Sequence, residues 1–272
     1  MRSVDRPSVV IPAHDEANTI AACLASITAE GDFDVVVVCN GCRDATATIA
    51  RSFGHGVRVV ELPGPDKSAA LNVGDRTVAS FPRVYVDADV TFAPGGLRAL
   101  VAALDHGALA AVPHATIDVR HSSRTVRSYY AIWRRLGVVD TGLCGAGVYA
   151  LSEQGRARFG DFPDLIADDL FVDQRFALDE RVTVEPGVSY GAPVTLRALL
   201  ARKTRVFAGN FQLARRGPAC HPARHSGDRW YQVVAHDPRL ATHVPAYVFV
   251  SAVAKLRARL TMIGSEPRWV ER

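Results

Sequence analysis

The sequence predicts an α/β fold built around a doubly wound, mostly parallel sheet. Short apolar runs alternate with helix-like stretches over the first ninety residues, which is typical of parallel strands joined by helical crossovers. One run, 34–39 (DVVVVC), is apolar without alternation, as expected for a strand covered on both faces. Polar residues lie in the segment that follows each run. These observations together predict a parallel sheet with a polar site at one edge.

The first part of the chain gives the clearest pattern. The run at 8–12 (SVVIP) ends at a proline, and the helix predicted at 16–29 has Ile20, Cys23 and Ile27 at the spacing of one helix face. The elements expected next are a strand at 34–39, a helix at 44–53, a strand at 57–62, a helix at 68–79 and a strand at 83–86.

The remainder of the chain is less regular. We expect a helix at 95–104, a strand at 108–114, a helix at 125–136, a strand at 145–151, a loop leading into a helix over 164–176, a basic helix at 195–207, a loop at 217–228 and a helix at 246–260. No linker separates two cores. We therefore expect one domain over 1–196, whose halves cover about 1–92 and about 93–196, with a basic extension over 197–272 packed on it.

Composition is that of a globular protein, with 48% hydrophobic and 22% charged residues, which excludes disordered, collagen-like and coiled-coil classes. No unbroken apolar stretch approaches the ~20 residues of a membrane-spanning helix. The first residues lack the apolar segment of a secretion signal. We therefore expect a cytoplasmic chain whose contact with a membrane, if it has one, is peripheral.

The five cysteines are widely spread, and a chain of this size does not need disulfides to fold. Cys39 and Cys42 form a C-x-x-C pattern, which suits a redox pair or half of a zinc site completed by Cys220 or His221. There is no second C-x-x-C and no thioredoxin-like aromatic neighbour. We interpret the pattern as a strand end entering a turn.

Charge is unevenly distributed. From Arg197 to the end there are fourteen Lys and Arg against four Asp and Glu, whereas the preceding residues carry a net charge of −6. The basic part suits a phosphate-bearing substrate or a membrane surface better than nucleic acid, because no aromatic stacking platform or binding motif accompanies it. In the helix at 246–260, apolar residues precede Lys255, Arg257 and Arg259. This helix suits an anionic membrane, the protein body or a second subunit.

Polar residues at the four predicted strand ends should converge, because ligands of parallel α/β sheets bind beyond the carboxyl ends of the strands. Asp87 and Asp89 (Asp-Ala-Asp) follow the fourth strand. Two such carboxylates repel each other unless a cation lies between them, and Mg²⁺ prefers one or two carboxylates together with substrate phosphates. A metal there would neutralise a departing diphosphate. The alternative is a pair that merely caps a turn.

The motifs VVIPAHDEANTI, VVVVCNGCRDATATIA, DKSAALNVG and VYVDADV together resemble the inverting family 2 glycosyltransferases of GT-A fold. The agreement continues in GLCGAGVYALS and FPDLIADDLFVDQRF and covers about 7–210. The resemblance implies a donor of the UDP-, GDP- or dTDP-sugar type and Mg²⁺ or Mn²⁺ on Asp87 and Asp89. The donor-binding residues that it implies are Pro12, His14, Glu16, Asn40, Asp44, Lys67, Asp87, Ala88 and Asp89. Asn40 departs from many relatives, which have Asp-Asp or Asp-Gly there.

The acidic pair Asp168-Asp169 is the candidate base. Transfer with inversion needs a group that takes the proton of the acceptor hydroxyl, and in the family an acidic pair at a helix start, usually Glu-Asp, supplies it. We expect Asp169 to be the base, with Asp168 orienting the acceptor or acting itself. The helix start should keep Asp169 ionised. The alternatives are a capping cluster and the Asp-rich motif of prenyl-transferring enzymes, which requires an all-helical fold.

The acceptor side is less strongly patterned. The aromatic residues at 129, 130 and 133 suit a sugar platform or core packing. The GLCGAG turn suits close approach of backbone to sugar. The basic residues Arg202, Lys203 and Arg205 suit an anionic substrate or a solvated face. His221 and His225 suit a lid over the donor or a surface loop. The residues expected to bind the acceptor are Tyr129, Trp133, Gly145 and Arg205.

The sequence thus predicts a metal-dependent inverting glycosyltransferase that moves one sugar to a hydroxyl of a sugar, a lipid-linked sugar or a small molecule. A sugar-phosphate nucleotidylyltransferase is the first alternative, but it would need a Gly-rich basic loop after the first strand, where this chain has PAHDEAN. A non-catalytic nucleotide-sugar binder is the second.

Overall fold

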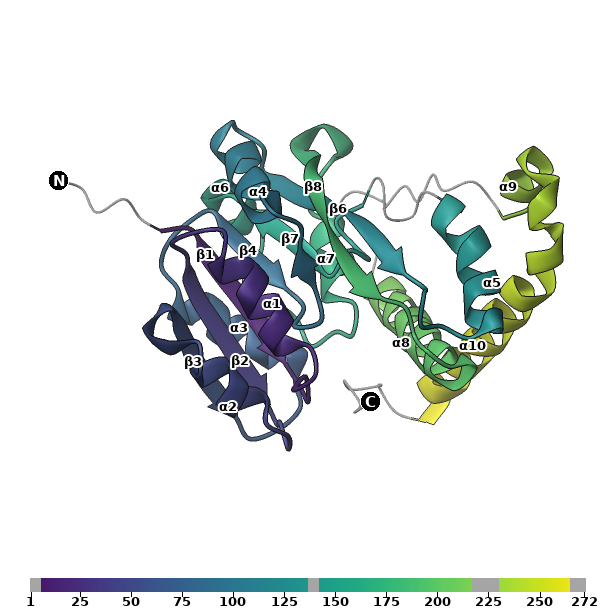
Figure 1. Cartoon of the computed structure of the whole chain (residues 1–272), viewed down its shortest axis with the longest axis horizontal. Helices are drawn as coiled ribbons and strands as arrows, with labels where there is room; N and C mark the ends of the chain where they lie inside the picture. Colours follow the sequence, from purple (N-terminus) through teal and green to yellow (C-terminus); the bar gives the residue numbers. More distant parts are fainter. Residues whose placement is uncertain (1–5, 137–141, 217–229, 265–272) are drawn as a thin grey trace.

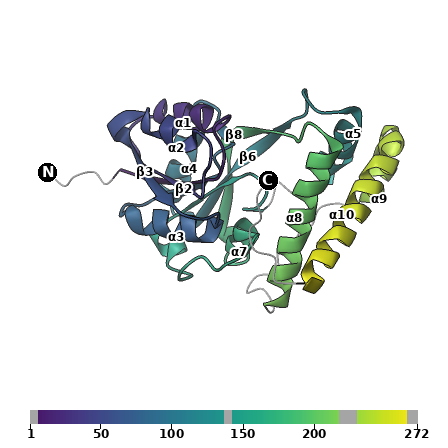
Figure 2. The ribbon, with the colours of Figure 1, turned by 90° about the horizontal axis from the view of Figure 1, so that it is seen from below.

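The computed structural model describes residues 6–136, 142–216 and 230–264. They contain one mixed, eight-stranded sheet in the order β3-β2-β1-β4-β7-β6-β8-β5, with helices on both faces (Figures 1 and 2). The strands are β1 (Ser8–Ala13), β2 (Asp34–Asn40), β3 (Val57–Leu62), β4 (Arg83–Val86), β5 (Thr91–Phe92), β6 (Ala110–Asp118), β7 (Val148–Leu151) and β8 (Arg181–Gly191).

In the first half of the chain the helices alternate with the strands, as predicted. The helices nearest the C-terminus lie beside the sheet. They are α1 (Ile20–Thr28), α2 (Thr46–Arg51), α3 (Lys67–Thr77), α4 (Gly96–Asp105), α5 (Arg124–Trp133), α6 (Glu153–Arg156), α7 (Asp168–Asp173), α8 (Leu196–Arg215), α9 (Trp230–His236) and α10 (Val244–Gly264). Among the described helices, none is long and apolar enough to cross a membrane.

The parallel half of the sheet positions the site. β1 pairs in parallel with β2 and β4, and β2 pairs in parallel with β3. Val35 to Val38 of β2 are all buried, because α1, α2 and α4 cover one face of the sheet and α3 and α7 the other (Figure 2). This confirms the predicted mostly parallel α/β fold and brings the ends of four strands to one edge.

β8 is a strand that the pattern did not predict. It pairs in parallel with β6 and antiparallel with β5. Its residues alternate irregularly between buried and exposed, and Pro186 and Gly187 interrupt it, so it lacks the apolar run by which the other strands are recognised. Gly187 is required by packing, since a Cβ there would overlap the His114 carbonyl.

The C-terminal helices pack beside the sheet rather than on its faces. α8 and α10 lie side by side, and α5 packs against α10 (Figures 1 and 2). Leu199, Leu200 and Val250 join Tyr129, Tyr130 and Tyr190 in one buried cluster that ties these helices to the ends of β6 and β8.

Candidate active site

The loops after β1, β2 and β4 and the start of α3 open into one cavity of about 2500 Å³. α5, α7, α8 and α10 complete its walls. The sequence-predicted residues that line it are Pro12, His14, Glu16, Asn40, Lys67, Asp87, Ala88, Asp89, Tyr129, Trp133, Gly145, Asp168, Asp169 and Arg205. The strand ends therefore converge with the acidic pair and with the helical wall.

Asn40 holds three loops together through its side-chain amide. Its Nδ2 donates to the Ala13 carbonyl at 2.9 Å, and its Oδ1 accepts from the Asp66 amide at 3.2 Å. Its own carbonyl lies 2.6 Å from Nδ1 of the buried His14. This position uses both a donor and an acceptor, which an aspartate could not supply. That explains why an asparagine suits this chain at a position where related sequences carry an acid.

Asp44 is the one predicted donor-binding residue that does not line the cavity. Its carboxylate accepts hydrogen bonds from the amides of Ala17 and Thr46, so it braces the first loop and the start of α2. Burial raises the pKa of Asp44, but the hydrogen bonds from the Thr46 hydroxyl and from the backbone amides together outweigh it and lower the pKa overall. Its role in the structure is to hold the loop that carries Glu16.

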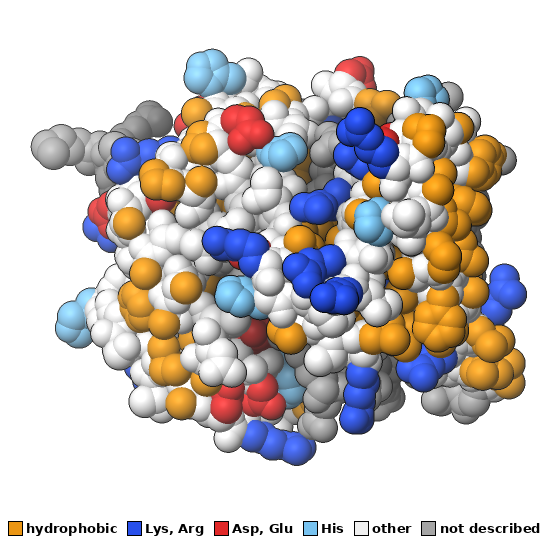
Figure 3. Space-filling model, turned by 45° about the vertical axis from the view of Figure 1, so that its right-hand side comes forward, with side chains coloured by type: hydrophobic (Ala, Val, Ile, Leu, Met, Phe, Trp, Pro, Cys, Tyr) orange, Lys and Arg blue, Asp and Glu red, His pale blue; other side chains and the backbone are white. Residues whose placement is uncertain are grey.

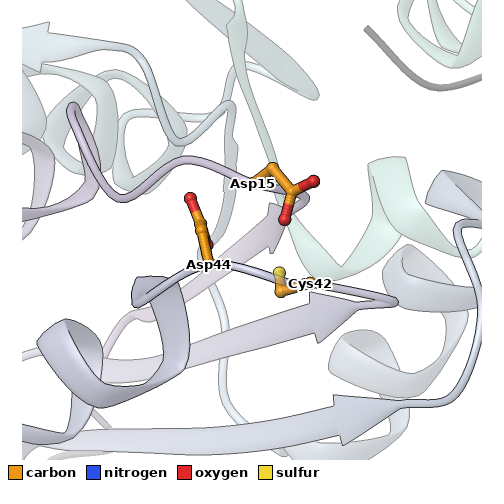
Figure 4. A group of neighbouring side chains, drawn as sticks. All are labelled: Asp15, Cys42 and Asp44. Carbon is orange, nitrogen blue, oxygen red and sulfur yellow. The ribbon is translucent and has the colours of Figure 1, made fainter.

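Asp44 also belongs to a small cluster with Asp15 and Cys42, whose ligand atoms all lie within 4.8 Å of one another (Figure 4). The carboxylate of Asp15 accepts from the Arg43 amide, so both acids already serve the loops. The Cys42 thiol is hydrogen-bonded to Cys39, which lowers the pKa of Cys42 to about 7. Both thiols are free, and Cys220 and His221, the predicted remote zinc ligands, lie outside the described residues.

Lys67 links the Asp-x-Asp motif to the acidic pair. Its Nζ lies 2.8 Å from Asp87 Oδ1 and 2.9 Å from Asp168 Oδ1. Burial lowers the pKa of Lys67, but the carboxylates of Asp168 and Asp87 outweigh it and raise the pKa overall. The lysine therefore stays charged and balances two acids that are far apart in sequence.

Asp168 and Asp169 differ in their surroundings. Asp168 is buried and paired with Lys67, whereas Asp169 accepts hydrogen bonds from the amides of Gly145 at 3.0 Å and Leu170 at 2.8 Å. Burial raises the pKa of both carboxyls. The sequence predicts that the helix start favours the Asp169 anion. Its amide bonds do so, but desolvation outweighs them and Lys67 together, so the pKa rises.

The GLCGAG turn joins the two acidic motifs. Gly145, at φ 89°, presents its amide to Asp169, and its carbonyl accepts from the Tyr190 hydroxyl at 2.8 Å. Gly147, at φ 69°, accepts from the Asp87 amide through its carbonyl at 2.7 Å. A Cβ on Gly147 would lie 2.8 Å from Val90. The glycines are thus needed for close approach between the two motifs. The predicted approach of this turn to a sugar stays a prediction.

The helical wall of the cavity is basic and aromatic. Lys203 is 7% exposed, and its Nζ lies 4.3 Å from the Trp133 ring centre and 5.3 Å from that of Tyr129. Burial, together with the nearby Arg202, lowers the pKa of Lys203 to about 7. Arg202 lies over the Tyr190 ring at 5.2 Å. Lys203 is therefore not on a solvated face, and the aromatic residues serve as core and as cavity wall at once.

Tyr190 was missed by the sequence reasoning, since it lies on the unpredicted β8. His221 and His225, the predicted lid residues, lie outside the described residues. A signal for burial of Lys203 was present, because it stands four residues after Leu199 on the face of α8 that packs inward.

Comparison with known proteins identifies the family. The model of the family described as "Glycosyl transferase family 2" matches residues 8–144, which is half of the chain. The chain belongs to glycosyl transferase family 2.

Curated glycosyltransferases are similar in sequence over part of the chain. The uncharacterized glycosyltransferases Rv0539 of Mycobacterium tuberculosis and Mb0553 of Mycobacterium bovis are each 36% identical over 104 residues, which cover 38% of this chain and 46% of the relative. Glycosyltransferase AglE of Haloferax volcanii is 32% identical over 90 residues, 30% of each chain. The match thus spans about half the length of the mycobacterial relatives.

Solved structures match the fold over a larger part of the chain than these relatives match its sequence. The mannosyltransferase PcManGT of Pyrobaculum calidifontis, in complex with GDP-Man and Mn²⁺, superimposes with a TM-score of 0.66 at 20% identity, over 96% of this chain and 88% of that one. Glucosyl-3-phosphoglycerate synthase of Mycobacterium tuberculosis, with Mn²⁺, UDP and glucosyl-3-phosphoglycerate, gives 0.58 at 23%, over 81% and 82%. At these identities the likeness shows the fold, which is GT-A-like.

In this family 2 chain, the residues that suit a divalent cation are Asp87 and Asp89. Both carboxylates follow the buried strand β4 and line the cavity, and the Asp87 side chain is 41% exposed. Mg²⁺ and Mn²⁺ prefer such hard oxygen ligands and complete their shell with phosphate and water. The cluster that contains Cys42 suits them less, because its carboxylates are engaged by backbone amides and a thiol is a soft ligand.

Proposed function

We propose that this chain is a metal-dependent, inverting glycosyltransferase that moves one sugar from a nucleotide-diphosphate sugar to an acceptor hydroxyl. The observation that supports this most is the lining of one cavity by the Asp-x-Asp carboxylates, Lys67 and the acidic pair. Family membership and the sugar-nucleotide and metal ligands named for PcManGT and glucosyl-3-phosphoglycerate synthase agree with it.

The donor would lie along the ends of β1, β2 and β4, with its diphosphate toward Asp87 and Asp89. Mg²⁺ or Mn²⁺, when bound to these carboxylates, supplies positive charge to the leaving diphosphate. Lys67 is partly buried next to Asp87 and remains charged, so it adds a second cation at the same place. Arg202, from the opposite wall, contributes a third.

Asp169 is the better base of the acidic pair. The Asp168 carboxylate is committed to Lys67 at 2.9 Å, whereas Asp169 accepts from two backbone amides in the described part of the chain and faces the cavity. A general base works best when its pKa approaches the working pH, and burial raises the pKa of Asp169 in that direction. Asp169 would take the acceptor proton while the acceptor oxygen attacks the anomeric carbon opposite the diphosphate. That attack inverts the anomeric configuration.

The acceptor would enter beside the helical wall, where Tyr129, Trp133, Gly145 and Arg205 line the cavity. A sugar can stack on an aromatic face there, and a phosphate or carboxylate on the acceptor would meet Lys203 and Arg205. We propose a hydroxyl on a sugar, a lipid-linked sugar or a small molecule as the acceptor.

A panel of UDP-, GDP- and dTDP-sugars with Mn²⁺ tests the proposal through release of the nucleoside diphosphate, since slow transfer to water suffices before the acceptor is known. We expect release from one nucleotide class, stopped by chelator, and NMR of the first product should show the anomer opposite to the donor. A retained configuration would overturn the inverting mechanism. Pyrophosphate formed from a nucleoside triphosphate and a sugar phosphate would favour a nucleotidylyltransferase instead.

A further inference from the structure

Helix α10 is apolar on two opposite faces. Its inner face, formed by Val250, Ala254, Ala258 and Met262, is buried against the rest of the protein. On the outer face Phe249 is 51% exposed, Leu256 59% and Ile263 79%. A helix of a globular protein usually has one apolar face toward the core and a polar face toward water. α10 has no such polar face.

The outer residues form a continuous stripe rather than isolated exposures. They recur at intervals of three or four residues, which places them along one side of a helix, and Figure 3 shows hydrophobic side chains gathered over the side of the molecule formed by the C-terminal helices. We call this set the α10 stripe, and its members are Pro245, Phe249, Ala252, Leu256, Leu260 and Ile263. Apolar patches of this kind usually mark an interaction site.

Basic residues flank the α10 stripe on both sides. Lys255 and Arg259 lie along one edge, where Lys255 Nζ is 5.3 Å from the Phe207 ring centre and the Arg259 guanidinium 5.9 Å from that of Phe211 on α8. The helical spacing puts Arg257 at the other edge, and it too is exposed. The helix sequence Val244–Gly264 contains no acidic residue. The face is thus apolar along its centre and cationic along its margins.

We propose that the α10 stripe docks on an anionic lipid bilayer surface, with the helix lying in the plane of the interface. Aromatic and aliphatic side chains would enter the boundary between headgroups and acyl chains, and the flanking cations would meet lipid phosphates. A second copy of this chain suits the face less well. Two α10 helices paired through their stripes would bring six cations together without a carboxylate on either helix to balance them.

Docking through α10 would also orient the cavity. Ser251, Lys255 and Leu260 of the same helix belong to the cavity wall, so the acceptor side of the cavity would lie next to the bilayer. This step rests on the proposed function, and it gives the acceptor class as a hydroxyl borne on a lipid headgroup. The docking itself does not depend on any catalytic activity.

Co-sedimentation of the full chain with vesicles tests the docking. The vesicles are phosphatidylcholine alone or with about one third phosphatidylglycerol, at about 0.1 M and about 1 M salt, where the Debye length falls from ~10 to ~3 Å. We expect binding to the anionic vesicles at low salt, weakened at least about tenfold at high salt or without phosphatidylglycerol, since each cation near such a surface strengthens binding roughly fivefold.

The variant that removes the stripe is Phe249→Ser/Leu256→Ser/Ile263→Ser, whose three side chains are exposed and do not line the cavity. Its binding to anionic vesicles should fall about tenfold or more. Leu178→Ser/Val182→Ser, which removes comparably exposed apolar side chains far from α10, should bind like the wild type. Thermal melting checks that all three proteins fold.

Equal vesicle binding by the stripe variant and the wild type would overturn the proposal, and so would no binding to anionic vesicles. Sedimentation equilibrium tests the other candidate occupant of the α10 stripe, which is a second copy of the chain. A wild-type dimer that the stripe variant abolishes, without vesicle binding, would assign the face to a second copy. Failure of nucleotide-sugar turnover in a chain that still binds vesicles would refute the proposed function alone.

Discussion

The two walls of the cavity are built on opposite electrostatic principles. On the wall formed by the strand ends, the acids already have partners: Asp87 and Asp168 share Lys67, and Asp169 accepts two backbone amides. On the wall formed by α8, Lys203 lies among aromatic rings, and within the described part of the chain no carboxylate pairs with it. The wall formed by the strand ends, which we call the donor wall, is therefore organised before substrate arrives. In the helical wall, by contrast, burial and the nearby Arg202 oppose the charge of Lys203, and an incoming anion would stabilise that charge.

Asp169→Asn should have the largest effect, because it removes the proposed base from the organised wall. We expect release of nucleoside diphosphate to fall by about 10²–10⁴-fold, the range for loss of a general base, while nucleotide binding persists. Asp161→Asn, which changes an exposed acid paired with Arg76 at 3.5 Å, is the matched control. Near-wild-type turnover by Asp169→Asn would move the role to Asp168.

Gly147→Ala tests whether the organised wall depends on the turn between its motifs. The new Cβ would lie 2.8 Å from Val90 at a backbone φ of 69°, so strain and overpacking together should cost roughly 2–4 kcal/mol of unfolding free energy. Urea denaturation measures this. Gly160→Ala adds a Cβ that meets nothing within 4 Å and has no positive φ, and it should change stability little. Equal stability of the two variants would remove the packing argument.

Lys203→Met tests whether the Lys203 side chain is desolvated in the wall formed by α8. The pKa of Lys203 is lowered to about 7 in the folded protein by burial, so between pH 7 and the ordinary lysine pKa the unfolded chain binds a proton that the folded chain does not. The free energy of unfolding should therefore gain from this group, by about 1 kcal/mol per pH unit, as the pH rises through that window.

The variant lacks that contribution but keeps an apolar side chain among the rings. It should be more stable than the wild type near pH 7, and the difference should shrink toward pH 10. Denaturation at a series of pH values checks this. Parallel curves for the two proteins would show that Lys203 is not desolvated as described.

Sequence reasoning succeeded for features that depend on short stretches of sequence. A buried apolar run followed by polar residues locates a strand end, so the strands at 57–62 and 83–86 were predicted with the bounds that the structure has, and the residues beyond them were predicted to meet. The helical crossovers between these strands have a clear 3.6-residue period, and they therefore predicted a parallel sheet. The convergence of the strand ends was predictable from this pattern, whereas the roles of the donor-binding residues came from the family resemblance.

Features that depend on packing between distant segments were not predicted. β8 lacks an apolar run because much of it is exposed, and with it Tyr190 was missed. Lys67 was predicted to bind the donor, but its ion pair with Asp168 of α7, some hundred residues later in the chain, was not predicted. Asp44 lies in the predicted donor-binding motif, but its carboxylate accepts from the amides of Ala17 and Thr46 and so stabilises the loop after β1 and the start of α2. The desolvation that raises the pKa of Asp169 depends on the folded surroundings and leaves no mark on the sequence.

Thermal melting with UDP, GDP and dTDP, each with Mn²⁺ or with chelator and with CMP for comparison, tests the organised donor wall most directly. We predict that one nucleoside diphosphate stabilises the wild type only with Mn²⁺, by about 2.7 kcal/mol at a hundred times its dissociation constant, and that Asp89→Ala abolishes the shift while Asp161→Ala retains it. A shift of the same size in chelator, or in Asp89→Ala, would contradict the proposed metal-dependent donor site.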